Sequence, residues 1–432
     1  MNCETVVFMK VFALVLFILT YVLLIALPKH RPWIALGSAA VFVVSGLVPP
    51  LELPGAVDWN ILMMLAGTMG TVAFFIESKM PNRMADRLLN RTPNVMWAAV
   101  ALSLFAGVVS AFMDNVATVL MIAPVGLAIA KRLDVSPVPL LITISVSSNL
   151  QGAATLVGDT TSIMLGGYAN MDFMDFLFMD GRFSIFWAVE LGAIATVPVI
   201  MLLFRKNRDP IPPAEQTVVE DMFPTWLLAA DIVLLIAVSF VRQKPAVTNG
   251  VICLAVFVVG AVRSLIKTRS AASAKNALLG IDTDTLLLLL GLFIVIRGVT
   301  EAGIIDDISR LFGRLGGGSL FVTYTLIVWG SVLCSAFIDN IPYVAAMLPV
   351  VEGIAHGMGF TPYVLYFGLL VGATLGGNLT PVGASANITA IGILRREGYE
   401  VKTRDFTRIG VPFTLIAVLT GYLYCWFVWA GV

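Results

Sequence analysis

Ser110-Ala-Phe-Met-Asp-Asn115 returns later in the chain as Ser335-Ala-Phe-Ile-Asp-Asn340, and both copies lie inside long apolar tracts. Each copy places a carboxylate and an amide, Asp114-Asn115 or Asp339-Asn340, where a membrane span is expected. Ionisable groups at membrane depth are costly, and they usually face a cavity or a transport pathway. Matching pairs in the two halves of a chain are typical of transporters that are built from repeats.

The composition is that of a polytopic membrane protein. Of the 432 residues, 59% are hydrophobic and only 12% are charged, whereas soluble domains carry about 25% charged residues. The formal net charge is zero, so nothing argues for nucleic-acid binding. The four cysteines form no CxxC or Cys/His cluster, which argues against a disulfide framework or a zinc site. The sequence contains no P-loop, Ser/His/Asp or HExxH pattern, so we expect no enzyme, no cofactor and no intrinsic ATPase, and nothing implies a separate ATPase subunit.

The apolar tracts predict an all-α polytopic fold of two inverted-topology repeats, each with about five membrane crossings, a re-entrant hairpin and a broken helix. The first repeat is predicted over 1–204, with its hairpin at about 95–131 and its broken helix at about 137–168. A polar cytoplasmic linker is predicted over 205–224. The second repeat is predicted over 225–432, with its hairpin at about 318–358 and its broken helix at about 361–394. Two full spans remain the alternative to each re-entrant hairpin.

Six clusters of lysine and arginine set the predicted orientation, because basic loops stay in the cytoplasm. They fall at 29–31, 79–91, 131–132, 205–208, 263–275 and 395–408. With all six inside, both termini are predicted to be extracytoplasmic in an inner (plasma) membrane. The spacing of the letters agrees, because Asp114 to Asp339 and Gly158 to Gly383 are both steps of 225 residues. An odd number of crossings in each half then inverts the second copy.

The candidate substrate- and ion-binding residues are the polar groups of the hairpin tips and of the broken-helix middles, where half-helix ends and free carbonyls meet. The first half offers Asp114, Asn115, Thr118, Asn149, Thr155, Gly158, Asp159, Thr160 and Ser162, and the second offers Asp339, Asn340, Asn378, Thr380, Gly383, Ser385 and Asn387. The alternative is that these groups only cap half-helices and satisfy broken backbone. Asp159 matches Ala384 in the second half, so it is a candidate for a single coupling-ion site or for a cap.

On these motifs the chain resembles the ion transporter superfamily, in particular the branch of arsenite/antimonite permeases, NhaD-type sodium/proton antiporters and the P protein. The resemblance covers nearly the whole chain. It is carried by Ser335-Ala-Phe-Ile-Asp-Asn-Ile-Pro342 with Met347-Leu-Pro349, and by Gly376-Gly-Asn-Leu-Thr-Pro-Val-Gly-Ala-Ser-Ala-Asn387. It implies two inverted repeats, each divided into scaffold and transport parts, with elevator-like motion and commonly a homodimer.

Two departures from the relatives bear on the substrate. Sodium-coupled dicarboxylate relatives have Ser-Asn-Thr at each hairpin tip, where this chain has Asp114-Asn115-Val116 and Asp339-Asn340-Ile341. Two carboxylates would repel a dianion unless they were protonated or neutralised by cations. Gly158-Asp-Thr-Thr-Ser162 also replaces the usual Gly-Asp-Pro-Pro-Asn, so that Ser162 stands in for an asparagine.

We therefore expect a secondary active transporter of a small inorganic ion or oxyacid, similar to arsenite permeases and coupled to protons through Asp114 or Asp339. One alternative is NhaD-type sodium/proton antiport, with Asp159 and the broken-helix carbonyls as ligands and sodium near Asn115, Gly158, Asn340 and Gly383. Others are a sodium-coupled (di)carboxylate or anion symporter and, in a different class, an ion channel. The coupling ion is expected to be H⁺ or Na⁺, and the expected partners are the lipid bilayer, the substrate and a second copy of the chain.

Overall fold

The computed structural model describes residues 3–133, 135–211, 216–219, 221–268 and 272–431. It is helical almost throughout, and the only sheet in the described part is a two-stranded hairpin of β1 (Phe178–Met179) and β2 (Arg182–Phe183). Eight helices of the described chain are long and apolar enough to cross a membrane. The predicted class, an all-α polytopic membrane protein, is confirmed.

The first half contains eleven helices and two short 3₁₀ turns, η1 (Pro28–His30) and η2 (Pro50–Glu52), within the described residues. The helices are α1 (Cys3–Ala26), α2 (Arg31–Val44), α3 (Leu53–Ala56), α4 (Trp59–Glu77), α5 (Met80–Leu89), α6 (Val95–Ser110), α7 (Asn115–Arg132), α8 (Val138–Gly152), α9 (Thr160–Tyr168), α10 (Phe173–Leu177) and α11 (Ile185–Leu203).

The second half runs through a similar order of elements. Its helices are α12 (Phe223–Ser239), α13 (Thr248–Thr268), α14 (Ala272–Leu279), α15 (Thr283–Glu301), α16 (Ile304–Leu315), α17 (Leu320–Ser335), α18 (Asn340–Met358), α19 (Tyr363–Gly376), η3 (Gly377–Leu379), α20 (Ser385–Arg396) and α21 (Thr403–Trp429). Helix pairs α6–α7 and α17–α18 occupy the two predicted hairpin tracts. The pairs α8–α9 and α19–α20 occupy the predicted broken helices.

Matching caps begin matching helices. Asp58 accepts a hydrogen bond from the backbone N–H of Ile61 at 3.1 Å at the start of α4, and Asp282 accepts one from Thr285 at 3.1 Å at the start of α15. An Asp before the first helical residue satisfies one of the free N–H groups of that end. The same device at matching positions indicates that the two halves share a local plan. The inversion of one half relative to the membrane stays a prediction.

The two halves interlock through glycines. A Cβ added to Gly67 of α4 would lie 2.3 Å from the carbonyl carbon of Cys253 on α13, and one added to Gly291 of α15 would lie 2.5 Å from that of Ala35 on α2. Only a glycine allows backbones to approach this closely. Each half therefore packs one long helix against a helix of the other half.

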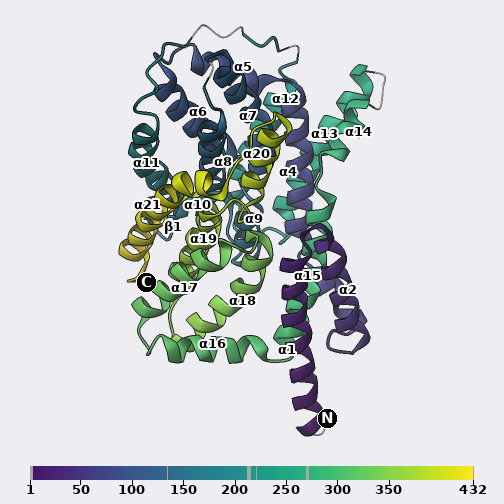
Figure 1. Ribbon diagram of the computed structural model, residues 1–432. Coiled ribbons are helices and arrows are strands. Elements are labelled where there is room, and N and C mark those ends of the chain that lie inside the picture. Colours follow the sequence, from purple (N-terminus) through teal and green to yellow (C-terminus); the bar gives the residue numbers. More distant parts are fainter. Residues whose placement is uncertain (1–2, 134, 212–215, 220, 269–271, 432) are drawn as a thin grey trace.

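Three stretches outside the predicted spans are partly helical. The basic stretch 79–91 forms α5, the stretch 263–275 includes the end of α13 and the start of α14, and α16 follows α15 directly. Lys79 and Gly303, which precede α5 and α16, both have positive φ values, of 58° and 70°. The sharp turn at each position starts a short amphipathic helix. Figure 1 shows α5 and α14 at the upper end of the molecule and α16 at the lower end.

The segment between α11 and α12 is tied to the first half. The backbone carbonyls of Asn207 and Asp209 accept hydrogen bonds from Met96 and Val95, at the start of α6. Thr217 donates from its backbone N–H and from its hydroxyl to Asp86 of α5, at 2.9 and 2.6 Å. The described part of the predicted linker is therefore held against two helices of the first half.

Candidate functional site

A cavity of about 440 Å³ lies where the two hairpin tips meet the helices α4 and α15. Eight of the predicted site residues line it: Asp114, Asn115, Asn149, Asp159, Thr160, Asp339, Asn340 and Ser385. Asp282 and Thr285, at the start of α15, line it as well. The apolar part of the wall comes from α4, from the start of α7 and α18, from Leu279 and Ile281 before α15, and from Ala386 of α20. The hairpin tips, about 225 residues apart in the chain, therefore open onto one cavity, as repeat-built transporters require.

The three predicted aspartates each cap a helix that begins at the cavity. Asp114 accepts from the N–H of Ala117 at 3.0 Å, and Asp339 accepts from that of Ile341 at 3.3 Å. Asp159 accepts from the N–H of Thr160 at 2.8 Å and from the hydroxyl of Thr161 at 2.9 Å. A carboxylate at a helix N-terminus is stabilised by the helix dipole. The capping role and the cavity-lining role thus belong to the same side chains.

The asparagines form a buried chain of hydrogen bonds that joins the two broken helices. Asn149 accepts from Asn115 at 3.2 Å and donates to Asn378 at 3.1 Å. Asn387 also donates to Asn378, at 3.3 Å, and accepts from Ser145 of α8 at 3.0 Å. Since Asn378 and Asn387 are fully buried and lie outside the cavity lining, they hold the breaks together rather than face the cavity.

Both hairpin tips use one bonding pattern. Ser110 donates to the side-chain oxygen of Asn115 at 2.8 Å, and Ser335 donates to that of Asn340 at 2.8 Å. The hydroxyl of Thr155 donates to the carbonyl of Ala111, and the hydroxyl of Thr380 donates to that of Ala336. Thr155 and Thr380 therefore fasten each break to its own hairpin tip and do not line the cavity.

Backbone carbonyls converge on both predicted glycines. A Cβ at Gly158 would lie 2.5 Å from the oxygen of Gly152 and 2.8 Å from those of Ser110 and Ala111. At Gly383 the corresponding oxygens are those of Gly377, Ser335 and Ala336, at 2.5, 2.7 and 2.9 Å. Oxygen clusters of this kind are the ligand type that hard cations prefer. Among the described residues, no group of three His, Cys, Asp or Glu side chains is placed to hold a metal ion.

Two of the predicted site residues, Thr118 and Ser162, are buried and do not line the cavity. Thr118 of α7 is fully buried, lies outside the cavity lining, and its hydroxyl has no hydrogen-bond partner among the described residues. Ser162 of α9 is fully buried too, and its hydroxyl lies 3.5 Å from the carbonyl oxygen of Gly152, at the limit of a hydrogen bond.

The basic residue at the site was not predicted from the sequence. Arg31, at the start of α2, donates to Asp339 with its Nη1 2.7 Å from Oδ2. In the sequence Arg31 counted only as loop charge, because no local pattern connects two residues 308 positions apart. Asp282 was not assigned to the site either. The signal that the sequence offered was the match of Asp282 with Asp58, 224 residues earlier in the chain.

Carboxylates outnumber basic groups around the cavity. Asp282 lies close enough to Asp114 for their charges to repel each other. Asp159 interacts electrostatically with both Asp114 and Asp339. Against these carboxylates stands Arg31, the one basic residue in the described part of the chain that forms an ion pair with a cavity aspartate. Like charges disfavour each other's ionised forms, and a bound proton or cation relieves the repulsion.

A bundle of membrane-length helices around a carboxylate-lined cavity defines a membrane transporter rather than an enzyme. The comparisons with known proteins agree, since the family model described as "Citrate transporter" (CitMHS) matches residues 21–372. The chain belongs to this family.

Several relatives are described as transporters. The chain is 30% identical to the uncharacterized transporter Rv2684 of Mycobacterium tuberculosis over 97% of this chain and 98% of that one. It is 27% identical to the human P protein over 94% of this chain, and spans 58% of the longer P protein. The chain is thus a secondary transporter of the citrate transporter/P protein type.

Two solved structures share the fold. The YdaH transporter of Alcanivorax borkumensis superposes with a TM-score of 0.60 at 15% identity, over 87% of both chains. MtrF of Neisseria gonorrhoeae, whose structure is described as illuminating a class of antimetabolite efflux pumps, superposes with a TM-score of 0.54 at 14% identity, over 85% of this chain and 80% of MtrF. At these identities the likeness concerns the fold alone.

Proposed function

We propose that this protein couples the movement of a cation, H⁺ or Na⁺, to the transport of a small inorganic ion or oxyacid through the cavity between the hairpin tips. The observation that supports this most is the shared cavity wall of Asp114, Asp159 and Asp339. Three carboxylates in one cavity favour the uptake of cations, and a proton or Na⁺ that binds there lowers the cost of bringing in an anion.

Sodium is the second candidate for the coupling ion, and the carbonyl clusters favour it. Asn115 contacts the first cluster through Ser110, and Asn340 contacts the second through Ser335. These residues, with Gly158 and Gly383, would supply oxygen ligands to Na⁺. Sodium/proton antiport of the NhaD type follows if the carboxylates carry the proton while the carbonyl clusters hold the sodium ion.

The family description names citrate. We expect citrate to bind in this cavity only if its negative charge is neutralised. A free polyanion would meet several carboxylates, one of them paired with Arg31, and like charges at such short range repel strongly. We therefore expect citrate to be carried only if the aspartates are protonated or cations enter with it. An uncharged oxyacid such as arsenous acid meets no such barrier.

Proton movement in proteoliposomes, followed with a pH-sensitive dye, tests the proposal. Sodium, lithium or potassium salts, arsenite and citrate are added one at a time to vesicles with the wild-type protein or with Asp114→Asn. We expect one of these additions to evoke a proton response that Asp114→Asn reduces by at least about tenfold, because the loss of a cavity carboxylate weakens cation binding.

Asp284→Asn is the matched control. Asp284 lies two residues after the cavity residue Asp282, is exposed, and does not line the cavity. It should keep the wild-type response. Full activity of Asp114→Asn in a folded protein would contradict the assignment of the site.

A further inference from the structure

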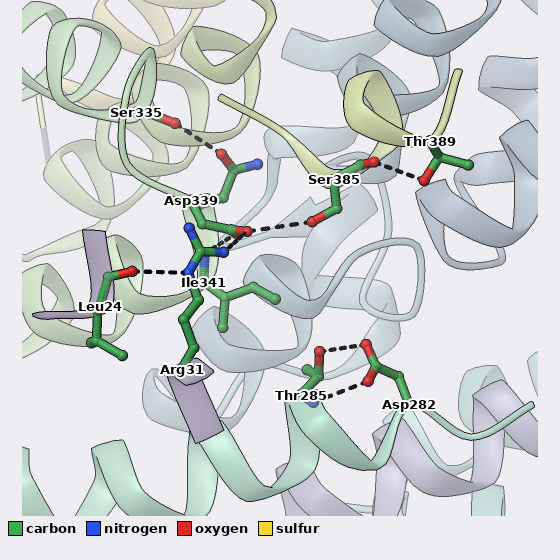
Figure 2. A network of polar contacts seen from close by, with 10 residues as sticks. Leu24, Arg31, Asp282, Thr285, Ser335, Asp339, Ile341, Ser385 and Thr389 are labelled. Atoms are coloured by element: carbon green, nitrogen blue, oxygen red, sulfur yellow. Dashed lines mark hydrogen bonds and ion pairs between the residues drawn. The ribbon is translucent and has the colours of Figure 1, made fainter. Parts of the chain in front are cut away.

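The turn between α1 and α2 brings Arg31 to the tip of the second hairpin. Its Nε donates to the carbonyl of Leu24 on α1 at 3.2 Å, while its Nη1 reaches Asp339. Tyr21 of α1 supports the same contact, because its hydroxyl donates to the carbonyl of Pro342 at 2.8 Å. Figure 2 shows Arg31 approaching Asp339 from one side and Ser385 approaching it from the other. The bond to Leu24 orients the guanidinium, and the bond from Tyr21 to Pro342 holds α1 against the start of α18.

Both oxygens of Asp339 are occupied. Oδ1 accepts from the N–H of Ile341, and Oδ2 accepts from Arg31 and from the hydroxyl of Ser385, at 2.7 and 3.3 Å. The side chains of Arg31 and Asp339 are only 21% and 11% exposed. A guanidinium stays charged at any pH that a protein survives. Asp339 therefore has a permanent positive charge at the distance where a bound cation would sit.

The first hairpin has no such partner. Asp114 forms no ion pair with a lysine or arginine of the described residues, and the donors to Asp159 are the uncharged Thr160 and Thr161. Lys244, a basic residue shortly before α13, does not pair with Asp114. Its ammonium group forms an ion pair with Asp172, at 2.5 Å. The two hairpin tips are alike in their letters and in their caps, but they differ in charge.

We propose that Arg31 is a resident cation of the transport site: it neutralises Asp339, so that the transported cation binds at Asp114 and Asp159. The inference rests on the proposed function and deepens it, because it assigns the mobile cation to one half of the site. It also sets the number of cations carried in each cycle, since Asp339 needs none while Arg31 stays in place.

Three variants separate this role from a plain structural contact. Asp339→Asn leaves Arg31 as an uncompensated positive charge beside the cation site, and we expect the half-saturating Na⁺ concentration to rise by about tenfold. Arg31→Gln frees Asp339 to take a cation of its own, so the dependence on Na⁺ should become steeper. Arg31→Gln/Asp339→Asn removes both charges and should return Na⁺ affinity to within about threefold of the wild type.

The experiment combines two readouts on the purified full-length protein. Melting temperatures of the four proteins at low salt show whether Arg31 and Asp339 interact: the double variant should lose less than the sum of the single losses. Na⁺-driven proton movement in proteoliposomes, with choline replacing sodium, shows whether the pair sets cation affinity. Lys10→Gln/Asp307→Asn is the matched control, because this exposed pair also links α1 to the second half, at 2.5 Å, and should leave the Na⁺ dependence unchanged.

The outcomes are distinct. Recovery of Na⁺ affinity in the Arg31/Asp339 double variant supports the proposal. A double variant as weak as Asp339→Asn would overturn it, because Asp339 would then bind the transported cation itself. Additive melting-temperature losses would overturn it as well. A wild type that gives no proton response to Na⁺, Li⁺ or any substrate tested, but in which Arg31 and Asp339 are coupled in stability, would overturn the proposed function and the coupling role of Arg31 with it.

Discussion

The cavity aspartates serve two purposes at once. Asp114, Asp159 and Asp339 cap the helices that begin at the cavity, and their side chains form part of its wall. The sequence could predict these residues because a carboxylate is costly inside an apolar tract and is kept there mostly where it lines a pathway. It could not predict Arg31, because the contact depends on the path of α1 and α2 through space and not on any local pattern.

Gly158 and Gly383 give the sharpest prediction at the residue scale. An added methyl group would lie 2.5 Å from a backbone oxygen at either position, so the carbonyl cluster has to open. We expect Gly158→Ala and Gly383→Ala each to lose about 1–3 kcal/mol of stability through overpacking, and Gly158→Ala, beside Asp159, also to lose the Na⁺ dependence of any transport. Thermal unfolding measures the first effect, and Na⁺-driven proton movement in proteoliposomes measures the second.

Gly357→Ala is the control for these variants. It lies in α18, and an added Cβ there has no neighbour within 4 Å among the described residues, so we expect its stability and its Na⁺ response to match the wild type. If Gly158→Ala kept the full Na⁺ response, the first carbonyl cluster could not be a cation site.

At the scale of elements, apolar length and glycine content predicted two hairpin tracts and two broken helices, and pairs of helices lie in these four stretches. The re-entrant character of the hairpins stays a prediction. The short helices α5 and α16 were missed because their stretches are too polar to be taken as spans. Both helices are amphipathic, and the helical spacing of their apolar residues was the signal that could have revealed them. The β1–β2 hairpin was missed too, since its strands are only two residues long.

Thr155 and Thr380 test whether the breaks depend on the hairpin tips. Replacing either by valine keeps the shape of the side chain and removes the hydroxyl that bonds the carbonyl of Ala111 or Ala336. A buried carbonyl that loses its partner costs about 1–3 kcal/mol, so each variant should melt at a lower temperature.

Thr389→Val is the matched control, because that exposed hydroxyl bonds only the carbonyl of Ser385 one turn earlier, at 2.9 Å. Its melting temperature should change little. Equal losses at all three positions would mean that the effect reflects the loss of any threonine hydroxyl rather than the attachment of the breaks.

At the scale of the whole molecule, each half packs a long helix against a helix of the other half. Helix α4 of the first half packs against α13 of the second, and α15 of the second half packs against α2 of the first. The step of 225 residues predicted which segments correspond, and the matching caps and hairpin-tip bonds agree with that correspondence. The contacts between the halves could not be predicted, because a repeat relates positions in the sequence without saying how the copies dock. The orientation in the membrane remains a prediction from loop charge.

Asp221 ties the end of the linker to α13. It binds Arg263 and Lys267, both at 2.8 Å, and the Arg263 guanidinium, followed by the Lys267 ammonium, holds the pKa of Asp221 below its usual range. A lowered carboxyl pKa stabilises the fold above the unfolded-state value of about 4, and this contribution is lost as the pH falls through the folded-state value.

Asp221→Asn should therefore melt below the wild type at pH 7, and the difference should shrink as the pH falls below about 4. High salt should shrink it as well, because the pair is partly exposed. A difference that stays constant with pH would contradict the ionic origin of the contact.

Cysteine modification at the cavity wall tests the central claim, that ions cross between the hairpin tips. Val116 lines the cavity at the start of α7, and Val108 of the same hairpin is half-exposed and does not line it. Val116→Cys and Val108→Cys, made with the native cysteines replaced by alanine, are treated with a small thiol reagent before the proton-movement assay. Modification at position 116 should abolish transport, and modification at position 108 should leave it intact. Full transport by protein completely modified at position 116 would contradict the account.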